Sequence, residues 1–184
     1  MNKKIILASA SPRRRELLTQ IGLDFDVVVS ETEEKINSTE PAKVVEELSA
    51  QKAEAVWEKL AVSGVFDPEQ KSGEATMTDT LVLGADTVVA CDGKILGKPA
   101  DSEAAAAMLT MLQGRGHEVY TGVTILYEEN GERKMLTFHE KTTVHFYPMT
   151  DAQIREYVAT GDPMDKAGAY GIQGFCARYI RGIE

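Results

Sequence analysis

LVLGADTVVAC, residues 81–91, is the clearest strand signal in the sequence. Its run of apolar and β-branched residues is typical of a buried strand, and the Asp92-Gly93 pair behind it predicts a hairpin turn. Asp86 is the one charge in the run. A carboxylate at such a place is expected to be partly buried and to need a partner or a metal ion. The alternative is that Asp86 lies at a strand end and hydrogen-bonds a turn.

Strands and helices alternate on both sides of this run. The predicted strands are residues 4–8, 25–29, 81–91, 117–127 and 133–147, with one more after the glycine-rich loop KAGAYGIQG. The first two predicted helices run from Pro12 to about Gly22 and from Pro41 to Leu60. A third covers residues 102–109 and ends before Gly114. The last begins after the cap Thr150 and is closed by Gly161. Residues 62–79 are expected to form a surface loop. Alternation of this kind indicates the α/β class.

Composition limits the possible functions. A chain of 184 residues is one domain or a single two-lobed unit. A net charge of −9 argues against broad nucleic-acid binding, and no apolar run approaches the ~20 residues of a membrane span. Cys91 and Cys176 are far apart and without metal-ligand company, so free structural thiols and a cytoplasmic location are expected. Neither nucleic acid nor membrane is expected as a partner.

The stretch LASASPRRRELL, residues 7–18, places three arginines where a helix is predicted to begin. A strand, a turn of small residues and a helix N-terminus form a common phosphate-binding geometry. Cations are unfavourable at this end of the helix dipole unless an anion offsets them. Successive residues differ by ~100° around the helix, so we expect Arg13 and Arg14 to face a ligand and Arg15 to be solvated. Ser9 and Ser11 can donate to phosphate oxygens, although Ser11 also fits as a simple helix cap.

Other charged residues allow two interpretations. Lys52 falls on the predicted apolar stripe of its helix, from which a lysine can also reach solvent. That stripe is Val45, Leu48, Ala55, Val56 and Leu60. Lys98, in LGKP, would by itself be a surface lysine. The acids Glu31, Glu33 and Glu34 are either solvated or placed to hold Mg²⁺ together with substrate phosphates.

Two further groups give weaker signals. The three histidines show no metal-ligand spacing, and we assign them no chemistry. The Gln173 amide, between Gly171 and Gly174, could pair with the edge of a base. A basic phosphate cradle, isolated acids and inward lysines together predict phosphoryl or nucleotidyl hydrolysis with a divalent ion.

Five motifs carry a resemblance to a known family. ILASASPRRRELL, LGADTVV, LGKP, VYTGV and DKAGAYGIQG, in this order, resemble the Maf family of nucleoside triphosphate pyrophosphatases over essentially the whole chain. The resemblance implies a two-lobed α/β fold with a long central mixed sheet, shared with the inosine-triphosphatase group, as one domain over 1–184 with the active cleft between its lobes. It implies hydrolysis between the α- and β-phosphates, with Mg²⁺ or Mn²⁺ as cofactor and a possible homodimer.

The resemblance also assigns roles. Asp86 matches the proton acceptor, and whether it is base, metal ligand or both stays open; Glu34 matches a metal ligand. Residues matched to substrate binding and specificity are Arg13, Thr87, Gln173, Ser11, Arg14, Lys52 and Lys98. Arg13, Thr87 and Gln173 resemble the subgroup that hydrolyses dTTP and UTP. Members usually continue past Glu184 through GDY and GLP segments, which complete the sheet edge and pack beneath the cleft.

Two alternatives remain open. One is a pyrophosphatase for damaged purine nucleotides on the same fold, which a substrate panel would separate. The other is a non-catalytic regulator of septum formation in cell division that acts through partners.

Overall fold

The structure, a computed structural model, describes residues 3–30, 33–62 and 79–184. Glu31 and most of the surface loop expected over 62–79 lie outside the described residues. The chain divides into two compact units. Unit 1 holds residues 1–37, 43–86 and 122–139, and unit 2 holds residues 38–42, 87–121 and 140–184.

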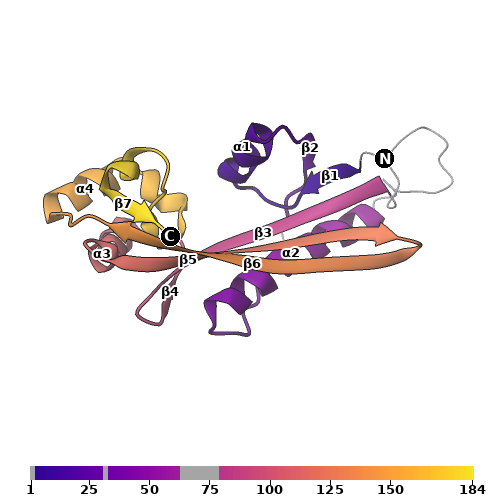
Figure 1. Ribbon diagram of the computed structural model, residues 1–184, viewed down its shortest axis with the longest axis horizontal. Coiled ribbons are helices and arrows are strands. Elements are labelled where there is room, and N and C mark those ends of the chain that lie inside the picture. The colour runs from indigo at the N-terminus through magenta and orange to yellow at the C-terminus, as the bar shows by residue number, and fades with distance from the viewer. Residues whose placement is uncertain (1–2, 31–32, 63–78) are drawn as a thin grey trace. The chain divides into compact units, whose positions relative to one another are not determined.

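Within the described part of the chain, strands form one seven-stranded sheet in the order β2-β1-β3-β5-β6-β7, with β4 paired to β3 (Figure 1). The strands are β1 (Lys4–Leu7), β2 (Phe25–Val27), β3 (Thr80–Cys91), β4 (Lys94–Leu96), β5 (Gly116–Glu129), β6 (Glu132–Phe146) and β7 (Ile180–Ile183). β1 runs parallel to both β2 and β3, whereas β3–β4 and β6–β7 are antiparallel. This confirms the predicted α/β class with a long mixed sheet.

The four described helices begin at the predicted residues, two of them directly after the predicted cap positions Ser11 and Thr150. They are α1 (Pro12–Gln20), α2 (Pro41–Val62), α3 (Ser102–Leu112) and α4 (Asp151–Ala159), followed by short 3₁₀ turns between Asp162 and Tyr179. Thr150 and Gln153 form a reciprocal capping box at the start of α4. Asp101 caps α3 by accepting from the Ala104 N–H at 2.8 Å. Ser11 stands at the N-cap of α1, but its side chain makes no capping hydrogen bond there.

In unit 1, α2 packs closely against one face of the sheet. A Cβ on Gly84 would lie 2.2 Å from the Ser49 carbonyl oxygen, and one on Gly122 would lie 2.2 Å from the Val45 carbonyl oxygen. Only glycine therefore allows the helix backbone to come this close. The buried core here is Ile6, Ala8, Ala53, Val56, Trp57, Leu60, Val82 and Leu126.

One part of the predicted α2 stripe is wrong. Ala55 is only half-buried, and Ala53 and Trp57 are buried instead. An α-helix has 3.6 residues per turn, so Ala53 and Trp57 lie on the same side of α2 as Leu60. Ala55 lies on a different side of the helix from these three residues.

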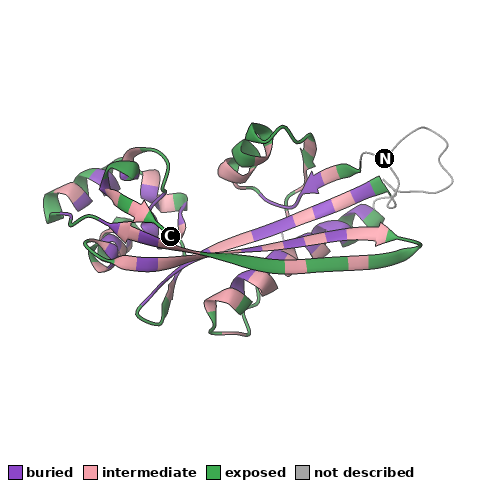
Figure 2. Ribbon diagram, in the orientation of Figure 1, coloured by how far each residue is buried: buried purple, intermediate pink, exposed green. Residues whose placement is uncertain are grey.

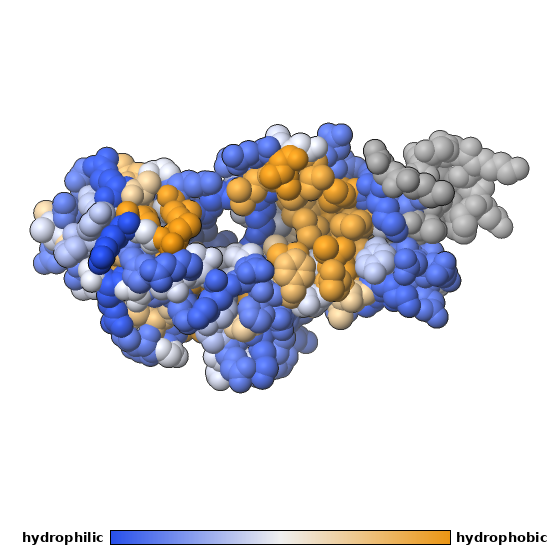
Figure 3. All heavy atoms as spheres, in the orientation of Figure 1, coloured by the Kyte–Doolittle hydropathy of each residue, from blue (hydrophilic) through white to orange (hydrophobic). Residues whose placement is uncertain are grey.

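The other face of the unit 1 sheet is less completely covered. Side chains alternate along each strand, so Leu81 and Leu83 point away from the face that holds Gly84, and both are half-buried. On β6, Leu136 and Phe138 are exposed. Figure 2 shows how much of β6 is exposed, and Figure 3 shows apolar side chains gathered in unit 1.

Unit 2 has a separate core, in which α3 and α4 contact each other and the 3₁₀ turns. Its largest fully buried side chains include Tyr157, Leu109 and Leu112. Cys91 and Cys176 are buried free thiols, as predicted. The β3–β4 hairpin turns at Asp92 and Gly93, both with positive φ. No helix in the described ranges is long and apolar enough to span a bilayer.

Candidate active site

The charged residues of the unit 1 site gather around the carboxyl ends of the parallel strands β1 and β2. β1 ends at Leu7, which pairs with Leu83, while β3 continues past that point to Asp86. The segment after β1 holds Ser9 and leads into α1, and the segment after β2 holds Glu34. In open α/β sheets, ligands bind outside the carboxyl ends of the strands, where such segments diverge.

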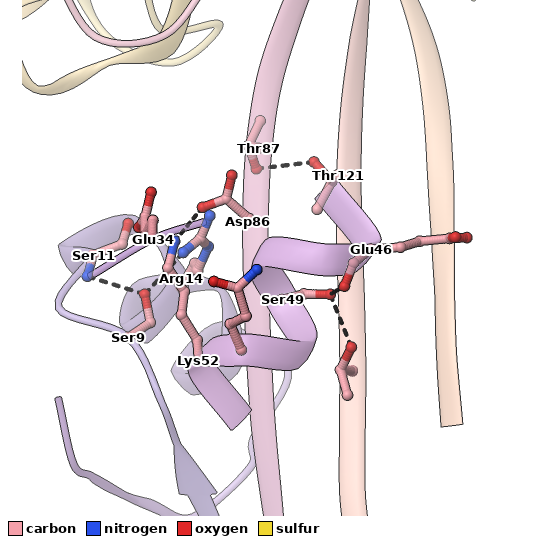
Figure 4. Close-up of polar contacts among 12 residues, drawn as sticks. Ser9, Ser11, Arg14, Glu34, Glu46, Ser49, Lys52, Asp86, Thr87 and Thr121 are labelled. Atoms are coloured by element: carbon pink, nitrogen blue, oxygen red, sulfur yellow. Dashed lines mark hydrogen bonds and ion pairs between the residues drawn. The ribbon is translucent and has the colours of Figure 1, made fainter. Parts of the chain in front are cut away.

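Arg14 is held at this edge by Ser9. Its Nη1 donates to the Ser9 Oγ at 2.9 Å, and the backbone N–H of Ser11 donates to the same oxygen at 3.3 Å. Burial lowers the pKa of Arg14, the charges of Asp86 and Glu34 raise it, and Arg13 lowers it. The guanidinium faces the carboxylates of Asp86 and Glu34 (Figure 4). Arg13 is half-buried, whereas Arg15 is exposed, as expected.

Lys52 joins the two carboxylates. Its Nζ donates to the Asp86 Oδ1 and lies 3.0 Å from the Glu34 Oε1 (Figure 4). The Lys52 and Asp86 side chains are 18% and 14% exposed, so this pair is largely shielded from solvent, while Glu34 is half-exposed. Lys52 thus points toward the sheet edge, and Asp86 is a partly buried charge with a partner rather than a turn residue.

Two polar side chains of α2, which the sequence analysis did not single out, hold the backbone next to Glu34. The Gln51 amide accepts from the Lys35 N–H at 2.9 Å and donates to the Lys35 carbonyl oxygen at 2.6 Å. Glu47 accepts from the Asn37 N–H at 3.0 Å. These side-chain hydrogen bonds satisfy backbone groups of Lys35 and Asn37, which lie outside the strands. They therefore hold this irregular segment in place.

Thr87 follows Asp86 in β3 and belongs to unit 2. Its hydroxyl lies 3.1 Å from the hydroxyl of Thr121, within the VYTGV motif (Figure 4). The position of Thr121 was not predicted, although the motif that contains it was noted. This contact sets the orientation of the Thr87 side chain.

Lys98 and Gln173 lie in two segments of unit 2 that contact each other. The Gly168 N–H donates to the Gly97 carbonyl oxygen at 3.0 Å, which joins LGKP to KAGAYGIQG. Gly168 has φ +66°, and a Cβ there would meet Val89 at 2.7 Å, so the loop lies directly against β3. Lys98 and Gln173 are both exposed.

A second bonded cluster anchors the start of this loop. The Lys166 Nζ, in a side chain 11% exposed, contacts Asp162 Oδ1 at 2.9 Å and Asp165 Oδ1 at 2.7 Å. The Tyr157 hydroxyl donates to the other Asp162 oxygen at 2.7 Å. Lys166 is therefore engaged within the loop, whereas Lys98 is exposed.

The unit 1 residues suit a phosphate ester with a hard cation. Arg14 and Lys52 supply positive charge for phosphate oxygens. Glu34 and Asp86 direct carboxylate oxygens at one cationic centre, now the Lys52 ammonium, so they fit as the protein's share of a Mg²⁺ or Mn²⁺ site. No group of three or more His, Cys, Asp or Glu side chains within the described residues is placed to hold a metal ion.

Comparison with known proteins agrees with this chemistry. The family described as Maf-like protein matches residues 4–184. A protein of Agathobacter rectalis named dTTP/UTP pyrophosphatase is 52% identical, over 98% of this chain and 87% of its own length. Proteins of the same name from Pelotomaculum thermopropionicum and Moorella thermoacetica are 46% and 47% identical, over 99% and 98% of this chain and 86% and 84% of their own lengths.

Proposed function

The chain belongs to the Maf family, and from this premise we propose that it hydrolyses nucleoside triphosphates, preferably dTTP and UTP, to nucleoside monophosphate and pyrophosphate. The observation that carries the proposal is the convergence of Arg14, Lys52, Glu34 and Asp86 at the carboxyl ends of parallel strands. It is supported by relatives about half identical that bear the name dTTP/UTP pyrophosphatase.

In the proposed reaction, Asp86 orients a water molecule toward the α-phosphorus and accepts its proton. The new bond joins the water oxygen to the α-phosphorus, and the bond to the oxygen that bridges the α- and β-phosphates breaks. Pyrophosphate leaves with the electron pair of that bond. A divalent cation bound by Glu34 and Asp86 would offset phosphate charge and lower the pKa of water.

The cationic side chains stabilise the charge that develops on the phosphate oxygens. We assign this role to Arg13, Arg14, Lys52 and Lys98, with Ser11 at the start of α1 as a further donor. Ser9 positions Arg14 through the 2.9 Å hydrogen bond. Thr87 and Gln173 are proposed to read the base together with Arg13. The cleft between two lobes and the homodimer stay predictions.

The test is pyrophosphate release with Mg²⁺ across dTTP, UTP, CTP, GTP, ATP and ITP. Turnover of dTTP and UTP well above the purine nucleotides supports the proposal. Preference for ITP would instead favour a pyrophosphatase for damaged purine nucleotides. Silence on every nucleotide, with a folded protein, would contradict the enzymatic function and favour a regulator that acts through partners.

A further inference from the structure

The Lys52 ammonium lies where two carboxylates converge. Its Nζ contacts the Asp86 Oδ1 and is 3.0 Å from the Glu34 Oε1. Lys52 comes from α2, Asp86 from β3, and Glu34 from the segment after β2. Three separate parts of unit 1 therefore meet at the Lys52 ammonium, with the Arg14 guanidinium facing the same carboxylates.

The backbone that carries each carboxylate is held by contacts other than those of Lys52. Asp86 stands in β3, and Gln51 fixes the backbone at Lys35, the neighbour of Glu34, through hydrogen bonds of 2.9 and 2.6 Å. Without a cation between them, the two negative charges would face each other across a partly buried site. Like charges held near each other are unfavourable unless cations offset them, and here Lys52 and Arg14 supply positive charge.

Among the described residues, too few ligands converge here to hold a divalent ion tightly while the ammonium stays. Glu34 and Asp86 are two donors, and the described residues include no group of three or more metal-binding side chains. Mg²⁺ in such sites is completed by water and by substrate phosphates. Two carboxylates that already bind an ammonium are a weak site for a second cation.

We propose that Lys52 and the divalent cation compete for one position between Glu34 and Asp86, so that the protein acquires its cation together with the nucleotide. This rests on the proposed function and specifies how its site is loaded. When a triphosphate enters, the flexible Lys52 side chain turns its ammonium to a phosphate oxygen.

Competition has a quantitative consequence. The apparent Kd for an ion equals its intrinsic Kd divided by the fraction of molecules whose site is open. If Lys52 occupies the position at least about nine-tenths of the time, removal of its charge lowers the Kd at least about tenfold.

The experiment measures Mn²⁺ binding without nucleotide, from the electron paramagnetic resonance signal of free Mn²⁺. It compares the wild type with Lys52→Met and with the matched control Lys59→Met, which removes an exposed lysine from the same helix. We expect wild type and Lys59→Met to bind Mn²⁺ equally weakly and Lys52→Met to bind at least about tenfold more tightly. Adding Asp86→Asn to Lys52→Met should abolish the gain.

Equal Kd values for Lys52→Met and Lys59→Met would overturn the inference. Circular dichroism checks that each variant is folded, and Lys52→Gln replaces Lys52→Met if the latter is not. Pyrophosphate release by the wild type is measured on the same preparation. Failure of that activity rejects the proposed function, whereas activity without the Mn²⁺ gain rejects only the competition.

Discussion

Asp86 and Lys52 form a largely shielded ion pair at the centre of the site. The Asp86 side chain is 14% exposed, and the desolvation of a charge at such a place is offset by a cation beside it. Lys52 supplies that cation and would otherwise be a charge on the inward face of α2. A substitution at either residue therefore has an effect on the site that exceeds its effect on the fold.

Asp86→Asn tests the base. The amide keeps the size and much of the hydrogen bonding of the carboxylate but cannot accept the proton from water. We expect an intact fold by circular dichroism and a turnover of dTTP or UTP at least about 10²-fold lower, the lower end for loss of a general base. Asp92→Asn, at an exposed position with φ 49° that asparagine accepts readily, is the matched control. Near-normal turnover in Asp86→Asn would remove Asp86 from the base role.

Lys52→Ala and Arg15→Ala test which cations of the site contact the substrate. Lys52 contacts two carboxylates at the site, whereas Arg15 is exposed on α1. We expect the loss of Lys52 to lower kcat/KM for dTTP by at least about tenfold, as for loss of a charged contact of ~1.5 kcal/mol, and the loss of Arg15 to change it little. Equal effects of the two substitutions would refute the assignment of these faces.

At the scale of elements, the approach of α2 to the sheet depends on two glycines. Gly84 in β3 and Gly122 in β5 both lie under α2, where a Cβ would overlap backbone atoms of the helix. This packing places Lys52 at the depth of Asp86. Two uncharged glycines thus set how deeply the charged side chain of Lys52 lies in the site.

Gly122→Ala should move α2 away from the sheet. The added Cβ would lie 2.2 Å from the Val45 carbonyl oxygen, and this backbone cannot yield as a flexible side chain would. We expect urea denaturation to show a free energy of unfolding lower by about 1–3 kcal/mol, the usual range for overpacking. Gly182→Ala, where nothing lies within 4 Å of the new Cβ, is the control and should change it little. Equal stability of the two variants would show that α2 adjusts freely.

Periodicity and cap residues allowed most elements to be predicted, because those signals are local. The hairpin at Asp92-Gly93, the capping box at Thr150 and the buried strand around Asp86 are each contained in a few neighbouring residues. The role of Gln51 could not be predicted, because a glutamine that clamps a distant backbone has no pattern in the sequence. The contact between Thr87 and Thr121 likewise joins residues far apart in the chain. The helical pattern alone left Lys52 with two interpretations, and its assignment to the site came from the family resemblance.

At the scale of the whole molecule, the core of unit 2 holds several titratable groups in neutral form. His117 is 3% exposed, and its Nε2 lies 2.6 Å from the Tyr170 hydroxyl. Burial raises the pKa of Tyr170 and raises that of Cys176 to about 12. Stability at neutral pH therefore depends on these groups remaining uncharged, and His117 is the one that titrates nearest to neutrality.

Acid should destabilise the fold through His117. Burial lowers the pKa of His117 to about 4, with the charges of His145 and Arg115 adding to the effect, whereas the unfolded value is 6.5. Between these values the unfolded chain binds a proton that the folded protein does not, so stability present above pH 6.5 is lost as pH falls toward 4. From about pH 7 to about pH 5, this one group should remove about 2 kcal/mol from the free energy of unfolding.

Urea denaturation at the two pH values measures this loss, and His117→Gln identifies its source. The glutamine amide can still hydrogen-bond the Tyr170 hydroxyl but does not titrate. We expect the loss of stability between the two pH values to be smaller in His117→Gln than in the wild type by about 2 kcal/mol. His139→Gln, at a half-exposed histidine paired with Glu46 in unit 1, is the matched control and should retain most of the wild-type loss. An equal loss in wild type and His117→Gln would mean that His117 becomes protonated without unfolding its surroundings, so that burial does not hold it neutral.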